Sequence, residues 1–190
     1  MLTRRLALAW LAATPLAGRA ADAQEPDLFE RLRGGGLVLL LRHARTEPGT
    51  GDPPGFRLGD CSTQRNLDAG GREQARAIGA RLRAERVQVG RVLHSQWCRC
   101  RETAELMGVG PVEPAEAINS FFEDRSRRDE QTRAARALAA GWGGPGTLVL
   151  VTHQVNVTAL TGVFPASGEA VVATPALEVL GRLPPPAGAG

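Results

Sequence analysis

Two uninterrupted apolar runs constrain the fold of this chain more than any other feature. Residues 37–41 read LVLLL, and residues 147–151 read TLVLV. A strand that is apolar at nearly every position must be covered on both faces, which is typical of a parallel sheet between helix layers. The two runs therefore predict a buried sheet rather than a half-exposed one.

The rest of the chain alternates between helix and strand patterns. Asp68 is a suitable N-cap for the first long helical stretch. Helices are predicted over 69–85, 96–107, 127–140 and 155–160, and further strands over 92–93 and 111–118, with edge strands over 169–174 and 177–180. This alternation predicts an α/β fold: a three-layer α/β/α sandwich with a mostly parallel central sheet.

The first 23 residues have the pattern of a signal peptide. Arg4 and Arg5 precede an apolar stretch over 6–16, and Ala21-Asp22-Ala23 is a small-x-small cleavage pattern. The apolar stretch is well short of the roughly 20 residues that cross a bilayer, so no stable membrane span is expected. We therefore expect a periplasmic or secreted protein, exported by the Sec or the twin-arginine route.

The remaining chain is expected to form one domain over 24–182, followed by a flexible tail over 183–190. The signal segment carries a net charge of +2 out of the +3 of the whole chain, which leaves about +1. This balance does not favour a nucleic-acid partner, because no large basic surface is left. All 23 basic residues are Arg, and Lys and Tyr are absent, which excludes Lys-based nucleophiles and phenol chemistry.

Two of the three histidines directly follow the two apolar strands. His43 comes after LVLLL and Arg42, and His153 comes after the second run and Thr152. In parallel sheets, ligands bind beyond the carboxyl ends of the strands. Arg42, His43 and His153 are therefore predicted to meet at one ligand-binding edge, whereas His94 is expected to be structural.

A third segment, Ser95 to Ala104, begins where another strand ends and leads into a helix. A helix N-terminus attracts anions, and an Arg guanidinium matches phosphate oxygens. Arg99 and Arg101 are two positions apart and point in different directions, so only one of them is expected to bind an anion.

The motifs so far resemble those of the histidine phosphatase superfamily, in its phosphoglycerate mutase-like small secreted branch. Arg42-His43-Ala44 with Thr46 is similar to its Arg-His-Gly signature, and Ser95 to Thr103 is similar to its Ser-Pro-x-x-Arg stretch. Thr152-His153 is similar to its later Gly-His, and Asn66-Leu67 with residues 71–75 to the start of its first helix. The resemblance covers roughly residues 36–161 and selects Arg99 over Arg101.

The resemblance implies a phosphatase that needs no metal or other cofactor. His43 would attack phosphorus to form a phosphohistidine, and Arg42, Arg99 and His153 would hold the phosphate oxygens. The partner would be a phosphorylated small-molecule or sugar substrate. Because Ser120 replaces the family's proton-donating Glu, a non-catalytic phosphate-binding protein on the same fold is the alternative.

Several residues are candidates for the remaining roles. Glu123 or Asp124 would have to supply the proton in place of the missing Glu. Residues 47–60, here called the flap, form a Gly/Pro-rich loop too long for a simple turn. The candidates for substrate binding are Thr46, Arg57, Gln64 and Arg65.

Three cysteines allow at most one internal disulfide. Cys61 is expected to pair with either Cys98 or Cys100, which would tie the loop after the first strand to the Arg99 helix. A zinc site formed by these cysteines and the histidines is not favoured, since no Cys-x-x-Cys spacing is present.

Overall fold

The computed structural model of this protein describes residues 25–186. The predicted signal peptide over 1–23 and the last four residues of the predicted tail lie outside this range. The first residue of the predicted tail, Leu183, belongs to a strand and is buried.

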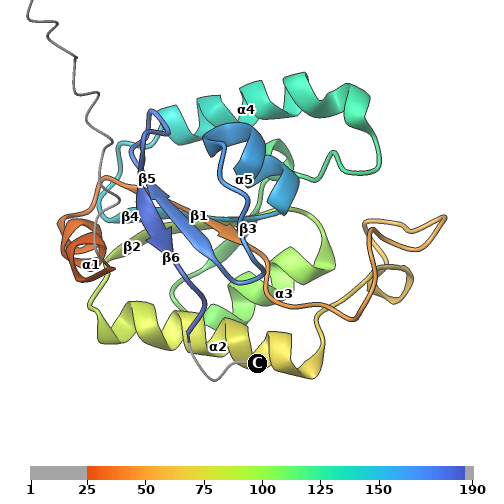
Figure 1. Cartoon of the computed structure of the whole chain (residues 1–190), viewed down its shortest axis with the longest axis horizontal. Helices are drawn as coiled ribbons and strands as arrows, with labels where there is room; N and C mark the ends of the chain where they lie inside the picture. The colour runs from red at the N-terminus through yellow and green to blue at the C-terminus, as the bar shows by residue number, and fades with distance from the viewer. Residues whose placement is uncertain (1–24, 187–190) are drawn as a thin grey trace, which may run out of the picture.

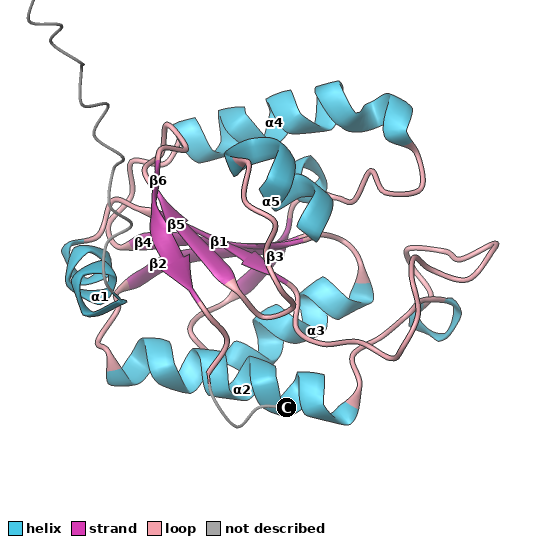
Figure 2. Cartoon of the chain, viewed as in Figure 1, coloured by secondary structure: helices cyan, strands magenta, loops and turns pink. Residues whose placement is uncertain are grey.

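The centre of the molecule is a six-stranded sheet that confirms the predicted α/β class (Figure 2). In spatial order, its strands are β3 (Val112–Pro114), β2 (Val89–His94), β4 (Thr147–Thr152), β1 (Val38–Arg42), β5 (Ala170–Ala173) and β6 (Val179–Leu183). The first four run parallel to one another, and β5 is antiparallel to both β1 and β6. Because β5 pairs on both sides, it is an inner strand and not the predicted edge strand.

Five α-helices cover the sheet within the described residues. They are α1 (Glu25–Gly34), α2 (Ala69–Ala84), α3 (Cys98–Met107), α4 (Arg128–Ala140) and α5 (Gln154–Thr161). Figure 1 shows α2 and α3 on one side of the sheet and α4 and α5 on the other. This is the predicted three-layer arrangement.

Alternate residues of β1 enter the two cores, which explains why its sequence is apolar throughout. Leu39 and Leu41 join the core with α1, α2 and α3, whereas Val38 and Leu40 join the core with α4 and α5. All four side chains are at most 1% exposed. Full burial of each such side chain stabilises the fold by about 1.5–3 kcal/mol. The strand is therefore held firmly between the two cores.

Helix α2 begins at the predicted N-cap. The carboxylate of Asp68 accepts from the backbone N–H of Gly71 at 2.6 Å and caps α2 as predicted. Helix α1 was not predicted; it buries Leu28, Phe29 and Leu32 against the sheet. No described helix has both the length and the apolar character needed to span a bilayer.

The pairing of β1 with β4 brings the two predicted histidines together. Arg42 lies opposite Thr152 in the ladder, and the backbone N–H of His43 donates to the carbonyl of Thr152 at 2.9 Å. His43 and His153 are the next residues of the two strands, so they leave the sheet at the same edge. The flap extends from this edge, on the right of Figure 1.

Candidate active site

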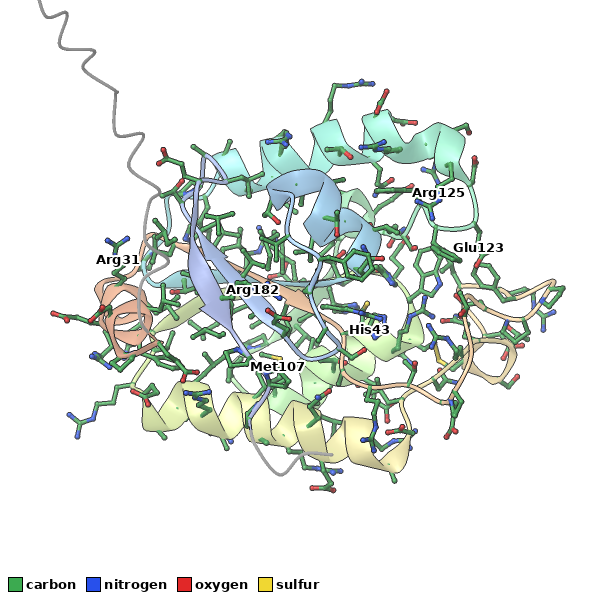
Figure 3. All side chains as sticks on the ribbon, viewed as in Figure 1. Arg31, His43, Met107, Glu123, Arg125 and Arg182 are labelled. Carbon is green, nitrogen blue, oxygen red and sulfur yellow. A yellow bond between two sulfur atoms is a disulfide. The ribbon has the colours of Figure 1, made fainter. Side chains whose placement is uncertain are left out.

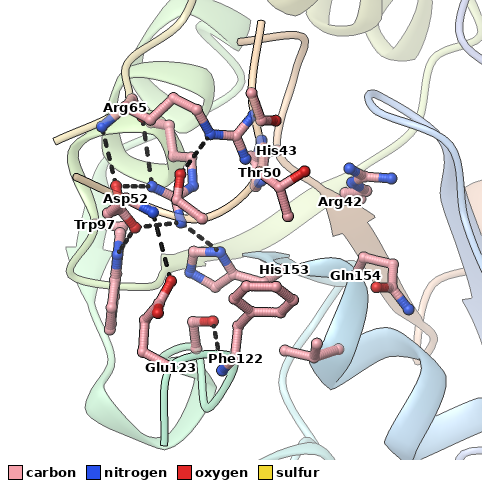
Figure 4. A pocket seen from close by; sticks show the side chains of 15 residues that line it. Arg42, His43, Thr50, Asp52, Arg65, Trp97, Phe122, Glu123, His153 and Gln154 are labelled. Atoms are coloured by element: carbon pink, nitrogen blue, oxygen red, sulfur yellow. Dashed lines mark hydrogen bonds and ion pairs between the residues drawn. The ribbon is translucent and has the colours of Figure 1, made fainter. Parts of the chain in front are cut away.

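A pocket of about 170 Å³ lies beyond the carboxyl ends of β1 and β4 (Figure 4). Its walls come from the two strand ends, the flap, the start of α3 and the loop before α4. Its side-chain lining includes Arg42, His43, Thr50, Asp52, Arg65, Trp97, Arg99, Ser120, Phe122, Glu123, His153 and Gln154. Five of the six residues predicted to be catalytic therefore line one pocket: Arg42, His43, Arg99, Glu123 and His153.

His43 is held as a neutral imidazole. Its Nδ1 lies 2.8 Å from the carbonyl oxygen of Ala44, which can only accept, so Nδ1 carries the proton and Nε2 keeps its lone pair. Burial, and then the charge of Arg99, lower the pKa of His43 well below its ordinary value. Ala44, where the family more often has Gly, is buried and is not among the described residues with positive φ, so its Cβ causes no strain.

His153 lies beside His43, with ring centroids 5.5 Å apart. Its Nε2 is 2.8 Å from the hydroxyl of Ser95, and that hydroxyl donates to Asn119 Oδ1 at 3.3 Å. The hydroxyl therefore accepts from Nε2, which leaves Nδ1 without a proton, 3.5 Å from a terminal nitrogen of Arg99. Burial, and then Arg99, also lower the pKa of His153.

Three guanidinium groups line the pocket: those of Arg42, Arg65 and Arg99. The Nε atoms of Arg42 and Arg99 are buried, and no other described residue hydrogen-bonds to them. Burial and the neighbouring arginines lower the pKa of Arg42 and of Arg65. Buried donors and concentrated positive charge suit a tetrahedral oxyanion.

Asp52 of the flap is a pocket residue that the sequence analysis did not identify. Its side chain is 2% exposed and forms a two-pronged ion pair with Arg99, at 2.8 and 3.1 Å. The indole N–H of Trp97 and the backbone N–H of Arg65 each donate to it at 2.9 Å. Figure 4 shows this carboxylate between Arg65 and Trp97. Nothing in the sequence marked Asp52 apart from its place in a long loop.

Three predicted substrate-binding residues lie outside this pocket and have structural partners instead. Gln64 is buried, and its side-chain oxygen accepts from the backbone N–H of Cys98 at 2.9 Å, at the start of α3. Thr46 accepts from Arg65 at 2.5 Å. Arg57 is ion-paired with Asp60 at 2.6 Å within the flap. Arg65, the fourth candidate for substrate binding, does line the pocket.

The two candidate proton donors separate clearly. Both carboxylates are exposed, but Glu123 lines the pocket, and Figure 3 shows it to the right of His43, toward the flap. Asp124 is on the exposed surface, where its carboxylate accepts from Ser126 and caps a short 3-10 helix over Arg125–Arg127. Ser120, at the position where the family has Glu, also lines the pocket. Of the two candidates, Glu123 is thus the one that lines the pocket.

The cysteines tie the flap to the Arg99 helix. Cys61 and Cys98 form a disulfide, one of the two predicted pairings. Cys100 is buried, 3.5 Å from His153 Nε2, and burial raises its pKa to about 12, so it stays a thiol. In the described part of the chain, no cluster of three or more His, Cys, Asp or Glu side chains is arranged to hold a metal ion. The third histidine, His94, donates a hydrogen bond from Nδ1 to the carbonyl of Ser95 and lies outside the pocket, as expected.

This combination of fold and site defines an α/β protein that presents a neutral histidine to an arginine-lined anion pocket. The chain belongs to the histidine phosphatase superfamily, branch 1, whose family model matches residues 38–147. The match includes Arg42, His43 and Arg99 and ends before His153.

Solved structures with the same fold are similar to this chain at low sequence identity. TTHB049 from Thermus thermophilus is 20% identical, with a TM-score of 0.54 over 78% of this chain and 99% of its own. The protein histidine phosphatase SixA complexed with tungstate is 15% identical, with a TM-score of 0.55 over 78% and 97%. Phosphoglycerate mutase from Thermus thermophilus is 19% identical, with a TM-score of 0.53 over 77% and 98%. No curated protein matches the chain significantly.

Proposed function

We propose that this protein is an exported phosphomonoesterase that works through a phosphohistidine intermediate and needs no metal ion. Its substrate would be a small or sugar-linked phosphate monoester. The observation that carries the proposal is the state of His43: a neutral imidazole with Nε2 unprotonated, in a pocket lined by three arginines. Members of the superfamily are phosphatases or mutases, so phosphoryl transfer is the chemistry that this site shares with its family.

In the first step, Nε2 of His43 attacks phosphorus and forms an N–P bond while the bond to the leaving oxygen breaks. Glu123 gives its proton to that oxygen, and the alcohol departs. In the second step, the Glu123 carboxylate takes a proton from water, whose oxygen attacks phosphorus and releases His43. Inorganic phosphate leaves, Glu123 is again protonated and His43 is again neutral.

Arg42, Arg65 and Arg99 supply the positive charge that this reaction needs. Phosphoryl transfer spreads negative charge over the three oxygens that neither attack nor leave, and fixed guanidinium donors stabilise that charge. The structure of SixA complexed with tungstate supports a tetrahedral oxyanion as a ligand of a protein with this fold.

Two observations support export. Residues 1–23 have the charge and apolar pattern of a signal peptide. The disulfide between Cys61 and Cys98 also fits an oxidising compartment, such as the periplasm or the medium.

A second candidate function is phosphate-ligand binding without turnover. It is favoured by Ser120, which cannot donate a proton as the family's Glu does. In this case the protein would bind phosphate through the same arginines and hydrolyse no ester at any pH.

The deciding experiment is His43→Ala, assayed with an aryl phosphate. We expect hydrolysis to be abolished, and we expect the unmodified protein, quenched during turnover, to carry acid-labile and base-stable phosphate. His94→Gln is the matched control, since His94 also ends a strand but lies outside the pocket. Undiminished turnover in His43→Ala would refute the mechanism, and tight phosphate binding without turnover in the unmodified protein would favour the binding function.

A further inference from the structure

Among the described residues that line the pocket, Asp52 has the one carboxylate that the proposed reaction does not use. It receives four hydrogen bonds, two from Arg99 and one each from Trp97 and Arg65. Two of these donors, Trp97 and Arg99, belong to the start of α3, whereas Asp52 belongs to the flap. The contact therefore joins a loop to the helix end that carries Arg99.

Asp52 is poorly suited to transfer protons. Burial alone would raise its pKa, but the hydrogen bond and charge of Arg99, with the donors on Arg65 and Trp97, outweigh burial and hold the pKa below its ordinary value. An acid that stays ionised cannot protonate a leaving group. The same four donors occupy its lone pairs, so it is not placed to accept a proton from water.

The ion pair instead fixes the orientation of Arg99. A two-pronged contact between a planar guanidinium and a carboxylate sets both position and rotation. Asp52 occupies the edge formed by the two terminal nitrogens. The other edge contains Nε, which is buried and without a partner among the described residues. One terminal nitrogen also lies 3.5 Å from His153 Nδ1, so the Nε–H is the donor still free for a phosphate oxygen.

The charges in the pocket are consistent with Asp52 staying in place when phosphate binds. With both histidines neutral, the three guanidiniums and the Asp52 carboxylate together carry a net charge of +2. A phosphate monoester is close to a dianion near neutral pH. If phosphate displaced Asp52 from Arg99, it would leave a buried carboxylate without its main partner, which is strongly unfavourable.

We propose that Asp52 is a positioning residue, which orients the Arg99 guanidinium from the flap so that its Nε edge binds the phosphate of the substrate. This inference rests on the proposed function of the pocket. It assigns to the flap a role in phosphate binding through Arg99, rather than through a direct contact with the substrate.

The test measures both the affinity for inorganic phosphate, by calorimetry, and kcat/KM for an aryl phosphate. In Asp52→Asn and Asp52→Ala we expect kcat/KM to fall and phosphate to bind more weakly, each by on the order of 100-fold, since misplacing a contact by about 1 Å has an effect of that size. Asp60→Asn is the matched control: Asp60 is a flap carboxylate paired with Arg57, away from Arg99, and Asn retains its capping ability.

A double-variant cycle distinguishes a positioning role of Asp52 from a general loss of structure in the variant. If Asp52 acts through Arg99, then Asp52→Asn added to Arg99→Met weakens phosphate binding no further than Arg99→Met alone. Equal losses in both backgrounds would overturn the proposal. Tighter phosphate binding in Asp52→Ala would also overturn it, because Asp52 would then be a competitor of phosphate.

Asp52→Glu covers the case in which the neutral variants fail to fold. It keeps the buried charge, but its extra methylene displaces the guanidinium, so we expect weakened phosphate binding; unchanged affinity would contradict a positioning role. The affinity measurements do not depend on turnover. If the unmodified protein binds phosphate but hydrolyses no ester, the proposed function fails, and the role of Asp52 is still decided by the phosphate affinities.

Discussion

The two sides of the pocket are held in place in different ways. On one side, Arg42, His43 and His153 continue β1 and β4, so the hydrogen-bonding register of a buried sheet sets their positions. On the other side, Asp52 and Glu123 come from loops that reach the pocket through side-chain contacts, a disulfide and backbone turns. In the proposed reaction, the first side provides the nucleophile at a fixed position, and the second provides groups that hold Arg99 and transfer protons.

The largest effect is expected for Glu123→Gln, which tests the role of the loop side. If Glu123 protonates the leaving oxygen, its loss slows hydrolysis of an alkyl phosphate by about 10²–10⁴-fold, because an alkoxide is a poor leaving group. An aryl phosphate with an acidic phenol needs little protonation, so its first step is affected much less. Steady-state kinetics with both esters measure the difference.

Asp124→Asn is the matched control for this variant, because Asp124 is the neighbouring carboxylate and faces solvent. It should retain normal rates with both esters. The quantity compared is kcat/KM, which reports the first step, because Glu123 also serves the second step of both esters. Equal loss of kcat/KM with both esters in Glu123→Gln would show that Glu123 does not act as the proton donor.

The same division explains what the sequence could predict. The apolar runs of β1 and β4 identify a sheet covered on both faces, and parallel pairing then places His43 beside His153. These positions follow from local pattern and strand register, which a sequence displays directly. Arg99 was found through a resemblance to family motifs and not through spacing alone.

The loop side could not be predicted in the same way. Asp52 looks like any loop acid in the sequence, and its burial depends on the flap folding over Trp97. Gln64 looked like a substrate ligand, yet it caps α3, since polar loop residues satisfy backbone groups as readily as ligands. Helix α1 was missed because only three of its ten residues are buried apolar side chains.

Removing the disulfide is a second test of how the loop side is held in place. Replacing Cys61 and Cys98 together by Ser releases the flap from α3, and we expect the free energy of unfolding to fall by about 2–4 kcal/mol. The KM for an aryl phosphate should rise as well, because the flap carries the partner of Arg99. Urea denaturation and steady-state kinetics measure the two effects.

A reductant provides the control for this pair of substitutions. It should lower the stability of the unmodified protein to that of the double variant and leave the double variant unchanged. If the reduced protein keeps its KM, then the ion pair between Asp52 and Arg99 alone holds the flap, and the disulfide contributes only to stability.

The last test of the comparison is a pH dependence of stability that differs between the two sides. His43 and His153 are buried and neutral, and burial and Arg99 lower their pKa values in the folded state, so the unfolded chain takes up protons first. Stability is therefore complete above the unfolded-state pKa of about 6.5 and falls with acidification, by up to about 1.4 kcal/mol per histidine for each pH unit. Asp52 also has a lowered folded-state pKa, but its unfolded value is about 3.9, so its contribution is lost only at more acidic pH.

Urea unfolding measured from neutral pH to about 4.5 tests this difference. The free energy of unfolding of His43→Asn should decline less steeply with acidification than that of the unmodified protein, and Asp52→Asn should keep the original slope over that interval. A slope that changes only in Asp52→Asn would mean that the loop side, and not the sheet edge, controls the response to mild acid.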